Sequence, residues 1–149
     1  MNNTLKYQWL IDELEISETC PYNGCGEKTM TAYRWTFSDI DNTNNFLPVG
    51  VSDKKKNPPR INDKSNNLFK CSCSGLSMYH TLESAISNFM TFPERTRKLL
   101  GYTNIAEGFL EKNEGLVGEV NEKGHFDFFE YINIDLLQKF KIVSNFMVV

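Results

Sequence analysis

The stretch KCSCSGLSMYHTLESAISNFM, Lys70 to Met90, specifies the fold more clearly than any other part of the chain. Within it, Gly75 to Tyr79 is short and strand-like, with Ser77 at its middle. Thr81 then offers a good N-cap for a helix. The apolar residues that follow repeat at the spacing of one buried helix face: Leu82, Ala85, Ile86, Phe89 and Met90. The stretch therefore predicts a strand that leads directly into a helix, a common location for functional side chains.

Two further helices are predicted on either side of this unit. Asn3 or Thr4 caps an N-terminal helix that ends near Glu15, and Trp9 is expected to pack this helix against the rest of the domain. A second central helix occupies Pro93 to Gly101, where proline suits the first turn and glycine suits the C-cap.

The segment TMTAYRWTF, Thr29 to Phe37, predicts a strand because it alternates and is rich in threonine and aromatic residues. Its aromatic face is expected to be core and consists of Tyr33, Trp35 and Phe37. Arg34 then points to the opposite side, among small residues that leave room around its guanidinium. A guanidinium in a cleft can bind a carboxylate or a phosphate, whereas at a sheet edge it forms a surface ion pair.

The remaining pattern predicts one α+β domain over residues 1–149, with a mixed or antiparallel sheet and two central helices. Residues 52–67 are rich in Asn, Asp, Lys and Pro and read as an exposed loop, which either covers a site or is an insertion without a role. Further strands are predicted at residues 46–51, 104–110, 116–120, 125–132, 140–143 and 145–149, and one helical turn at residues 135–139.

Composition narrows the classes of function. The net charge is −3, so the overall basic footprint of a nucleic-acid-binding protein is absent. Two local basic patches remain, and each is either a local nucleic-acid footprint or a solvated surface. The first is a loop with Lys54, Lys55, Lys56, Arg60 and Lys64, and the second is a helix face with Arg95, Arg97 and Lys98. The sequence shows neither a secretory signal nor an apolar run of roughly 18 residues, so we expect a cytoplasmic protein without a membrane partner.

The four cysteines form two close pairs, Cys20 with Cys25 and Cys71 with Cys73. In a reducing compartment they are not expected to form a disulfide framework. Two pairs brought together by the fold can supply the four ligands of a structural zinc ion, although neither pair has the common C-x2-C spacing. The alternative is four separate, partly buried thiols. A formal Cys–His set for nucleophilic catalysis is available, without any local signature of a cysteine hydrolase: Cys71, Cys73, His80 and His125.

The segment HFDFFEYI predicts a strand in which Glu130 shares an apolar face with Phe126, Phe128 and Ile132. Burial there raises the pKa of the Glu130 carboxyl unless a cation or a donor pairs with it. Alternatively, Glu130 reaches water or pairs with a lysine. His125 follows a glycine at the start of the strand, which favours a solvated or hydrogen-bonded ring over a metal ligand.

The order of three residues resembles the Arg–Ser–Glu layout of ADP-ribosyltransferase toxins and effectors. They are Arg34 in AYRWT, Ser77 in GLSMY and Glu130 in FFEYI. The resemblance spans Thr29 to Ile132. It implies that the arginine binds NAD, that the serine supports the NAD pocket, and that the glutamate stabilises an oxocarbenium-like transition state. Two departures are visible: the Ser-Thr-Ser element is reduced to LSM, and Phe128 replaces the Glu or Gln two residues before the glutamate.

Two hypotheses about function follow. The first is an NAD-dependent ADP-ribosyltransferase-like or NAD-cleaving enzyme, a toxin or effector whose transferase activity modifies a protein target. The second is a non-enzymatic, zinc-stabilised module of a defence or mobile-element system that binds a protein partner. They differ in geometry, because an enzyme needs Arg34, Ser77 and Glu130 to converge on one pocket.

Overall fold

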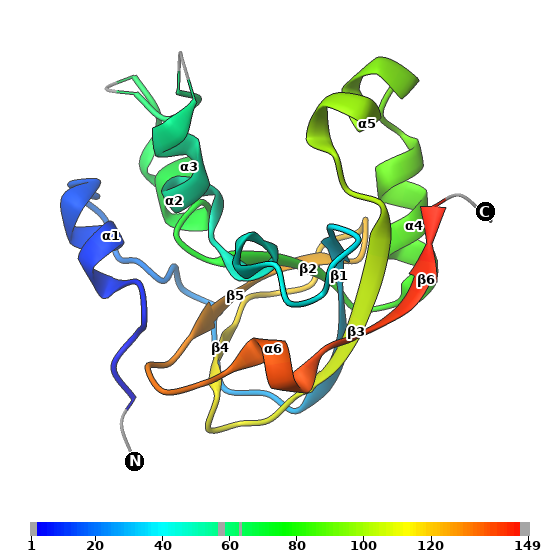
Figure 1. The fold of residues 1–149 in the computed structure, drawn as a ribbon. Coiled ribbons are helices and arrows are strands. Elements are labelled where there is room, and N and C mark those ends of the chain that lie inside the picture. Colours follow the sequence, from blue (N-terminus) through cyan, green and yellow to red (C-terminus); the bar gives the residue numbers. More distant parts are fainter. Residues whose placement is uncertain (1–2, 57–58, 63, 147–149) are drawn as a thin grey trace.

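The chain is organised around a six-stranded antiparallel sheet with the strand order β4-β5-β2-β1-β3-β6 (Figure 1). A computed structural model describes residues 3–56, 59–62 and 64–146. The strands are β1 (Met30–Thr36), β2 (Leu76–Tyr79), β3 (Asn104–Leu110), β4 (Gly115–Val117), β5 (His125–Glu130) and β6 (Lys141–Asn145). The sheet is therefore antiparallel, one of the two arrangements that the sequence left open.

Short helices accompany the sheet, which confirms the predicted α+β class. They are α1 (Gln8–Glu13), α2 (Val49–Ser52), α3 (Asn67–Ser72), α4 (Leu82–Met90), α5 (Glu94–Leu100) and α6 (Leu136–Lys139), with the 3-10 turns η1 (Thr43–Phe46) and η2 (Asp53–Lys55). Figure 1 shows α1, α2 and α3 on one side of the view and α4 and α5 on the other. None of the helices that the structure describes has the length and hydropathy of a membrane-spanning segment.

The two central helices begin and end where the sequence predicts. The Thr81 side chain accepts a hydrogen bond from the Ser84 backbone N–H (3.0 Å), which satisfies one of the free donors at the start of α4. Gly101 ends α5 with a φ of 78°, a left-handed conformation that glycine adopts without steric cost. Helix α4 packs on β1, β2 and β3 through its buried residues Ala85 and Phe89.

One face of the sheet is buried and the other is half-buried, which corrects the prediction for β1. The larger core lies on the face opposite the aromatic residues of β1 and contains Ala32, Phe46, Leu76, Met78, Ala106, Leu110, Val117, Phe126, Phe128, Leu136 and Phe140. Arg34 shares that buried side of the strand and is itself only 7% exposed. The aromatic face is half-buried and packs with Ile105 and α4 in a smaller cluster. Alternation shows which side chains share a face, but not which face is covered.

Several local predictions were wrong. Trp9 is 48% exposed, because Leu10 and Ile11 form the buried side of α1. Residues 46–51 form turns of η1 and α2 instead of a strand. The exposed loop predicted at residues 52–67 is confirmed for most of its described residues, but it includes η2 and the buried Asp53, and α3 begins at its end. Residues 57, 58 and 63 lie outside the described residues. One strand, β6, replaces the two predicted near the C-terminus, and residues 147–149 lie outside the described residues.

Gly108 provides a test of the larger core. A Cβ at this position would lie 2.6 Å from ring carbons of Phe140, which is buried beside the Phe46 ring. We therefore expect Gly108→Ala to lower the free energy of unfolding by about 1–3 kcal/mol through overpacking. Gly26→Ala is the matched control, because a Cβ there meets nothing within 4 Å. Urea denaturation that gives equal stabilities for the two variants would contradict the packing described here.

Candidate functional site

A cavity of about 540 Å³ lies among the described residues. Its walls come from β1, β2 and β5, from α2 and η2, and from α5 and the segments next to it. Aromatic rings form a large part of the lining: Trp35, Phe37, Tyr79, Phe92 and Tyr102. The indole N–H of Trp35 donates to the carbonyl of Ala85 in α4 (2.8 Å), which fixes this ring in place. The volume lies within the range of sites for small organic ligands.

The charged side chains that line this cavity are all cationic. They are Arg34, Lys55, Lys56 and Arg60, and no carboxylate from the described part of the chain lines it. Asp53, which is 2% exposed, accepts hydrogen bonds from the backbone N–H groups of Arg60 and Ile61, both at 2.9 Å. Because Asp53 opens η2, these bonds hold Arg60 beside the turn that carries Lys55. The basic patch seen in the sequence is thus partly folded into the cavity wall.

Arg34 lines the cavity, and its guanidinium is hydrogen-bonded to the protein itself. Its Nε donates to the carbonyl of Asn45 (2.6 Å), Nη1 to that of Ser77 (2.7 Å) and Nη2 to that of Leu47 (3.3 Å). The register between β1 and β2 is set at Tyr33 and Tyr79, and the Arg34 contact to Ser77 adds a side-chain link between these strands. Arg34 therefore holds the 45–47 segment against β2. NAD binding by Arg34 stays a prediction.

Ser77 and His125 meet on the cavity wall. The Oγ atom of Ser77 lies 2.6 Å from Nε2 of His125, and both residues line the cavity. Antiparallel pairing of β2 with β5 causes this approach, because Ser77 is opposite Asp127 and Tyr79 is opposite His125. Burial lowers the pKa of His125, and the nearby Asp127 carboxylate opposes that effect. The sequence indicated a hydrogen-bonded histidine but contained no signal for its partner.

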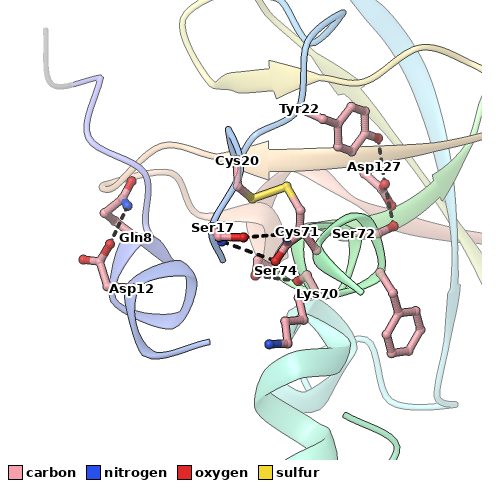
Figure 2. Close-up of a disulfide and its surroundings, with 12 residues drawn as sticks. Gln8, Asp12, Ser17, Cys20, Tyr22, Lys70, Cys71, Ser72, Ser74 and Asp127 are labelled. Carbon is pink, nitrogen blue, oxygen red and sulfur yellow. Dashed lines mark hydrogen bonds between the residues drawn. A yellow bond between two sulfur atoms is a disulfide. The ribbon is translucent and has the colours of Figure 1, made fainter. Parts of the chain in front are cut away.

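Asp127 connects this pair to a disulfide. Figure 2 shows Asp127 hydrogen-bonded to Tyr22 and Ser72 near the disulfide. Its Oδ1 lies 3.9 Å from Nε2 of His125, while Oδ2 accepts hydrogen bonds from the hydroxyls of Tyr22 and Ser72, both at 2.7 Å. Tyr22 is two residues after Cys20, and Ser72 directly follows Cys71. These cysteines are bonded to each other, so the disulfide joins the two segments that supply the donors. Burial, followed by the charge of Asp127, raises the pKa of Tyr22 and keeps its hydroxyl protonated.

Glu130 lies away from the cavity lining, beneath the N-terminal segment. It is 2% exposed, and the Nζ of Lys6 is 3.6 Å from its Oε2. The backbone of the same segment is tied to β5, because the N–H of Lys6 donates to the Glu130 carbonyl (2.9 Å). Neither carboxylate oxygen has a hydrogen-bond partner among the described residues. Burial raises the pKa of Glu130 to about 7, which confirms the effect expected from its apolar strand face, and Lys6 opposes this shift.

The cysteines differ from the expected set of four reduced thiols. Cys20 and Cys71 form a disulfide, whereas Cys25 and Cys73 are free. Burial raises the pKa of both free thiols to about 11, so they are protonated at neutral pH and poorly suited to act as nucleophiles. No group of three or more His, Cys, Asp or Glu side chains in the described ranges is placed to hold a metal ion. The four-cysteine site is therefore not assembled in this structure, and zinc binding stays a prediction.

Of the three residues that carry the sequence resemblance, the structure brings two together. Arg34 and Ser77 line the same cavity, and Glu130 does not. Sequence reasoning missed Asp127 and the pairing of His125 with Ser77, and it gave Lys55, Lys56 and Arg60 only as a basic patch. Alternation did place His125 and Asp127 on one strand face, but their partners depend on strand register. No protein-family model, curated protein or solved structure matches the chain.

The stability of the fold should depend on pH through Glu130. Because its pKa is raised from 4.5 to about 7, the unfolded chain loses this proton before the folded chain does. Stability from this group is therefore complete below about pH 4.5 and declines up to about pH 7, by roughly 3 kcal/mol in total. Glu130→Gln should flatten that decline in urea titrations from pH 4 to 8, and Glu122→Gln, at an exposed position, should not. A wild-type decline that persists in Glu130→Gln would contradict this assignment.

The disulfide should contribute strongly to stability. It closes a loop with a sequence separation of 51 residues, and the chain entropy removed from the unfolded state corresponds to about 4 kcal/mol. Reduction of the wild-type chain should lower the free energy of unfolding by about that amount. The double variant Cys20→Ala with Cys71→Ala should have the same effect. Cys25→Ala, which removes a free thiol, is the control. Equal urea midpoints for the oxidised and reduced wild-type chain would rule out this contribution.

Proposed function

We propose that the cavity binds a small anionic ligand with a flat aromatic part, of the nucleoside diphosphate class. NAD and ADP-ribose, which the sequence resemblance suggests, contain this unit. One observation carries the proposal: among the described residues, the charged groups that line the cavity are cationic and none is a carboxylate. The whole chain, in contrast, has a net charge of −3.

The positive charge of the lining favours an anionic ligand in this cavity. Cationic side chains around a concave, partly apolar site attract anionic ligands and repel cations. Lys55, Lys56 and Arg60 are the groups assigned to the diphosphate, because the guanidinium of Arg34 already donates to backbone carbonyls. Asp53 contributes indirectly by holding the backbone at Arg60.

The aromatic walls suit the other half of such a ligand. The ring of Trp35 is 5.2 Å from that of Tyr79 in a stacked arrangement, and the Phe37 and Tyr102 rings stack at 4.9 Å. These flat apolar surfaces can pack against a nucleobase, as aromatic residues do in many nucleotide sites.

The NAD-cleaving reaction remains a separate prediction. It requires a carboxylate near the bound ribose to stabilise positive charge in the transition state. The carboxylate that the resemblance assigns to this role is Glu130, which lies outside the lining of this cavity. The alternative of a protein-binding module likewise stays a prediction.

Calorimetric titration with ADP, ADP-ribose, NAD and adenosine tests the proposal. We expect ADP to bind at least about tenfold more tightly than adenosine, and binding to weaken as salt rises. The triple variant Lys55→Gln, Lys56→Gln and Arg60→Gln should lower ADP affinity by at least about tenfold. Nicotinamide release in the NAD samples separately tests the predicted cleavage.

A matched control removes three positive charges elsewhere. Lys28, Lys112 and Lys141 are exposed and do not line the cavity, so their replacement by Gln should change ADP affinity less than about twofold. Equal affinity for ADP and adenosine, or an equal loss in both triple variants, would overturn the proposal.

A further inference from the structure

The contact between Ser77 and His125 has the geometry of a nucleophile and its base. The Oγ to Nε2 distance of 2.6 Å is a short hydrogen bond, and both side chains line a cavity large enough for a small substrate. A hydrogen bond that only holds two strands together would not need to face a cavity. The opposite face of β2, in contrast, carries the fully buried Leu76 and Met78.

His125 is also in the ionisation state that a base requires. Burial lowers its pKa, so the ring is neutral at neutral pH and one of its nitrogens can accept a proton. The short contact to Ser77 assigns this role to Nε2, with the ring proton on Nδ1.

Asp127 can stabilise the charge that His125 gains. Its Oδ1 lies 3.9 Å from the same Nε2 that contacts Ser77, and its Oδ2 is held by the hydroxyls of Tyr22 and Ser72. A positive charge that forms on the imidazole therefore appears next to a fixed carboxylate. Asp127 acts through His125 and is a positioning residue, not a catalytic one.

We propose that Ser77 and His125 form a catalytic pair that hydrolyses carboxylic esters bearing a negative charge. The pair supplies the nucleophile and the base, and Lys55, Lys56 and Arg60 supply the cationic surface that selects an anionic ester. The inference uses the cavity of the proposed function but does not depend on a nucleotide as its ligand.

The reaction has two steps. In the first, Ser77 Oγ attacks the ester carbonyl while its proton passes to Nε2 of His125, and the C–O bond to the alcohol breaks. The alcohol leaves with that proton, and the acyl group remains on Ser77. In the second, a water molecule gives a proton to His125 and attacks the acyl carbon. The carboxylic acid leaves, and Ser77 recovers its proton from His125.

An alkyl fluorophosphonate probe tests the pair directly on the wild-type chain. Attack by Ser77 forms an Oγ–P bond and releases fluoride, with the serine proton passing to His125. Mass spectrometry of the digested protein should locate the label on Ser77. Ser77→Ala and His125→Gln should each reduce labelling at least tenfold, whereas Ser87→Ala, at an exposed position of α4, should not change it. Glutamine at position 125 can still bond to Ser77 but cannot act as the base.

Substrate class is tested with two p-nitrophenyl esters, the neutral acetate and the anionic hemisuccinate. The hemisuccinate should have the higher kcat/KM, and the Lys55, Lys56 and Arg60 triple variant should remove that preference. Equal kcat/KM values for the two esters in the wild-type chain would overturn the anionic class.

Asp127→Asn tests the positioning role. The ionisable groups around the His125 ring are Asp127 on β5 itself, Tyr79 on β2, whose ring centre is 5.5 Å away, and the cationic residues of the cavity. Loss of the carboxylate should move the acid limb of the labelling rate to lower pH, because Asp127 raises the pKa of His125. An unchanged midpoint would remove Asp127 from the proposal.

Wild-type protein that leaves Ser77 unlabelled and hydrolyses neither ester above the rate of the Ser77→Ala variant would overturn the catalytic pair. Labelling of Ser77 in a chain that shows no preference for ADP over adenosine would support the pair while contradicting the proposed nucleotide site.

Discussion

The buried guanidinium of Arg34 is the contact on which the cavity depends. A buried charge that lacks partners is costly, and three backbone carbonyls from two segments compensate for its desolvation. Those contacts fix residues 45–47, and the chain then continues through α2 and η2 to the cationic side chains of Lys55 and Lys56. Lysine could not replace this arrangement, because its ammonium lacks the planar fork that reaches separate carbonyls. An arginine that binds only its own chain thus positions the side chains assigned to the ligand.

Local patterns in the sequence predicted elements whose causes are local. The Thr81 cap and the Gly101 stop depend on their nearest neighbours, and both helix boundaries agree with the structure. The segment at residues 46–51 was misread because a short apolar run fits a strand or a helical turn equally well. Helix α3 was hidden by the polar residues before it, although Asn66 caps it by accepting from the N–H of Phe69.

The site was harder to predict because its contacts are distant in sequence. Ser77 and His125 are 48 residues apart, and their approach depends on the register between β2 and β5. A shift of one residue would send one of the two side chains to the other face. The apolar strand neighbours of Glu130 indicated its burial, but they did not decide between a buried carboxylate and one that reaches water or a lysine. The folding of Lys55 and Arg60 into a cavity wall was not predictable, because it depends on two hydrogen bonds to Asp53.

The disulfide makes the cavity sensitive to the chemistry of its surroundings. Tyr22 and Ser72 both bind Asp127, and the covalent link between their segments is the bond from Cys20 to Cys71. The disulfide is formed in an oxidising compartment and reduced in a reducing one, so the Asp127 carboxylate next to His125 is held differently in the two. The thiol composition of the buffer thus affects the electrostatics of the cavity as well as the stability of the fold.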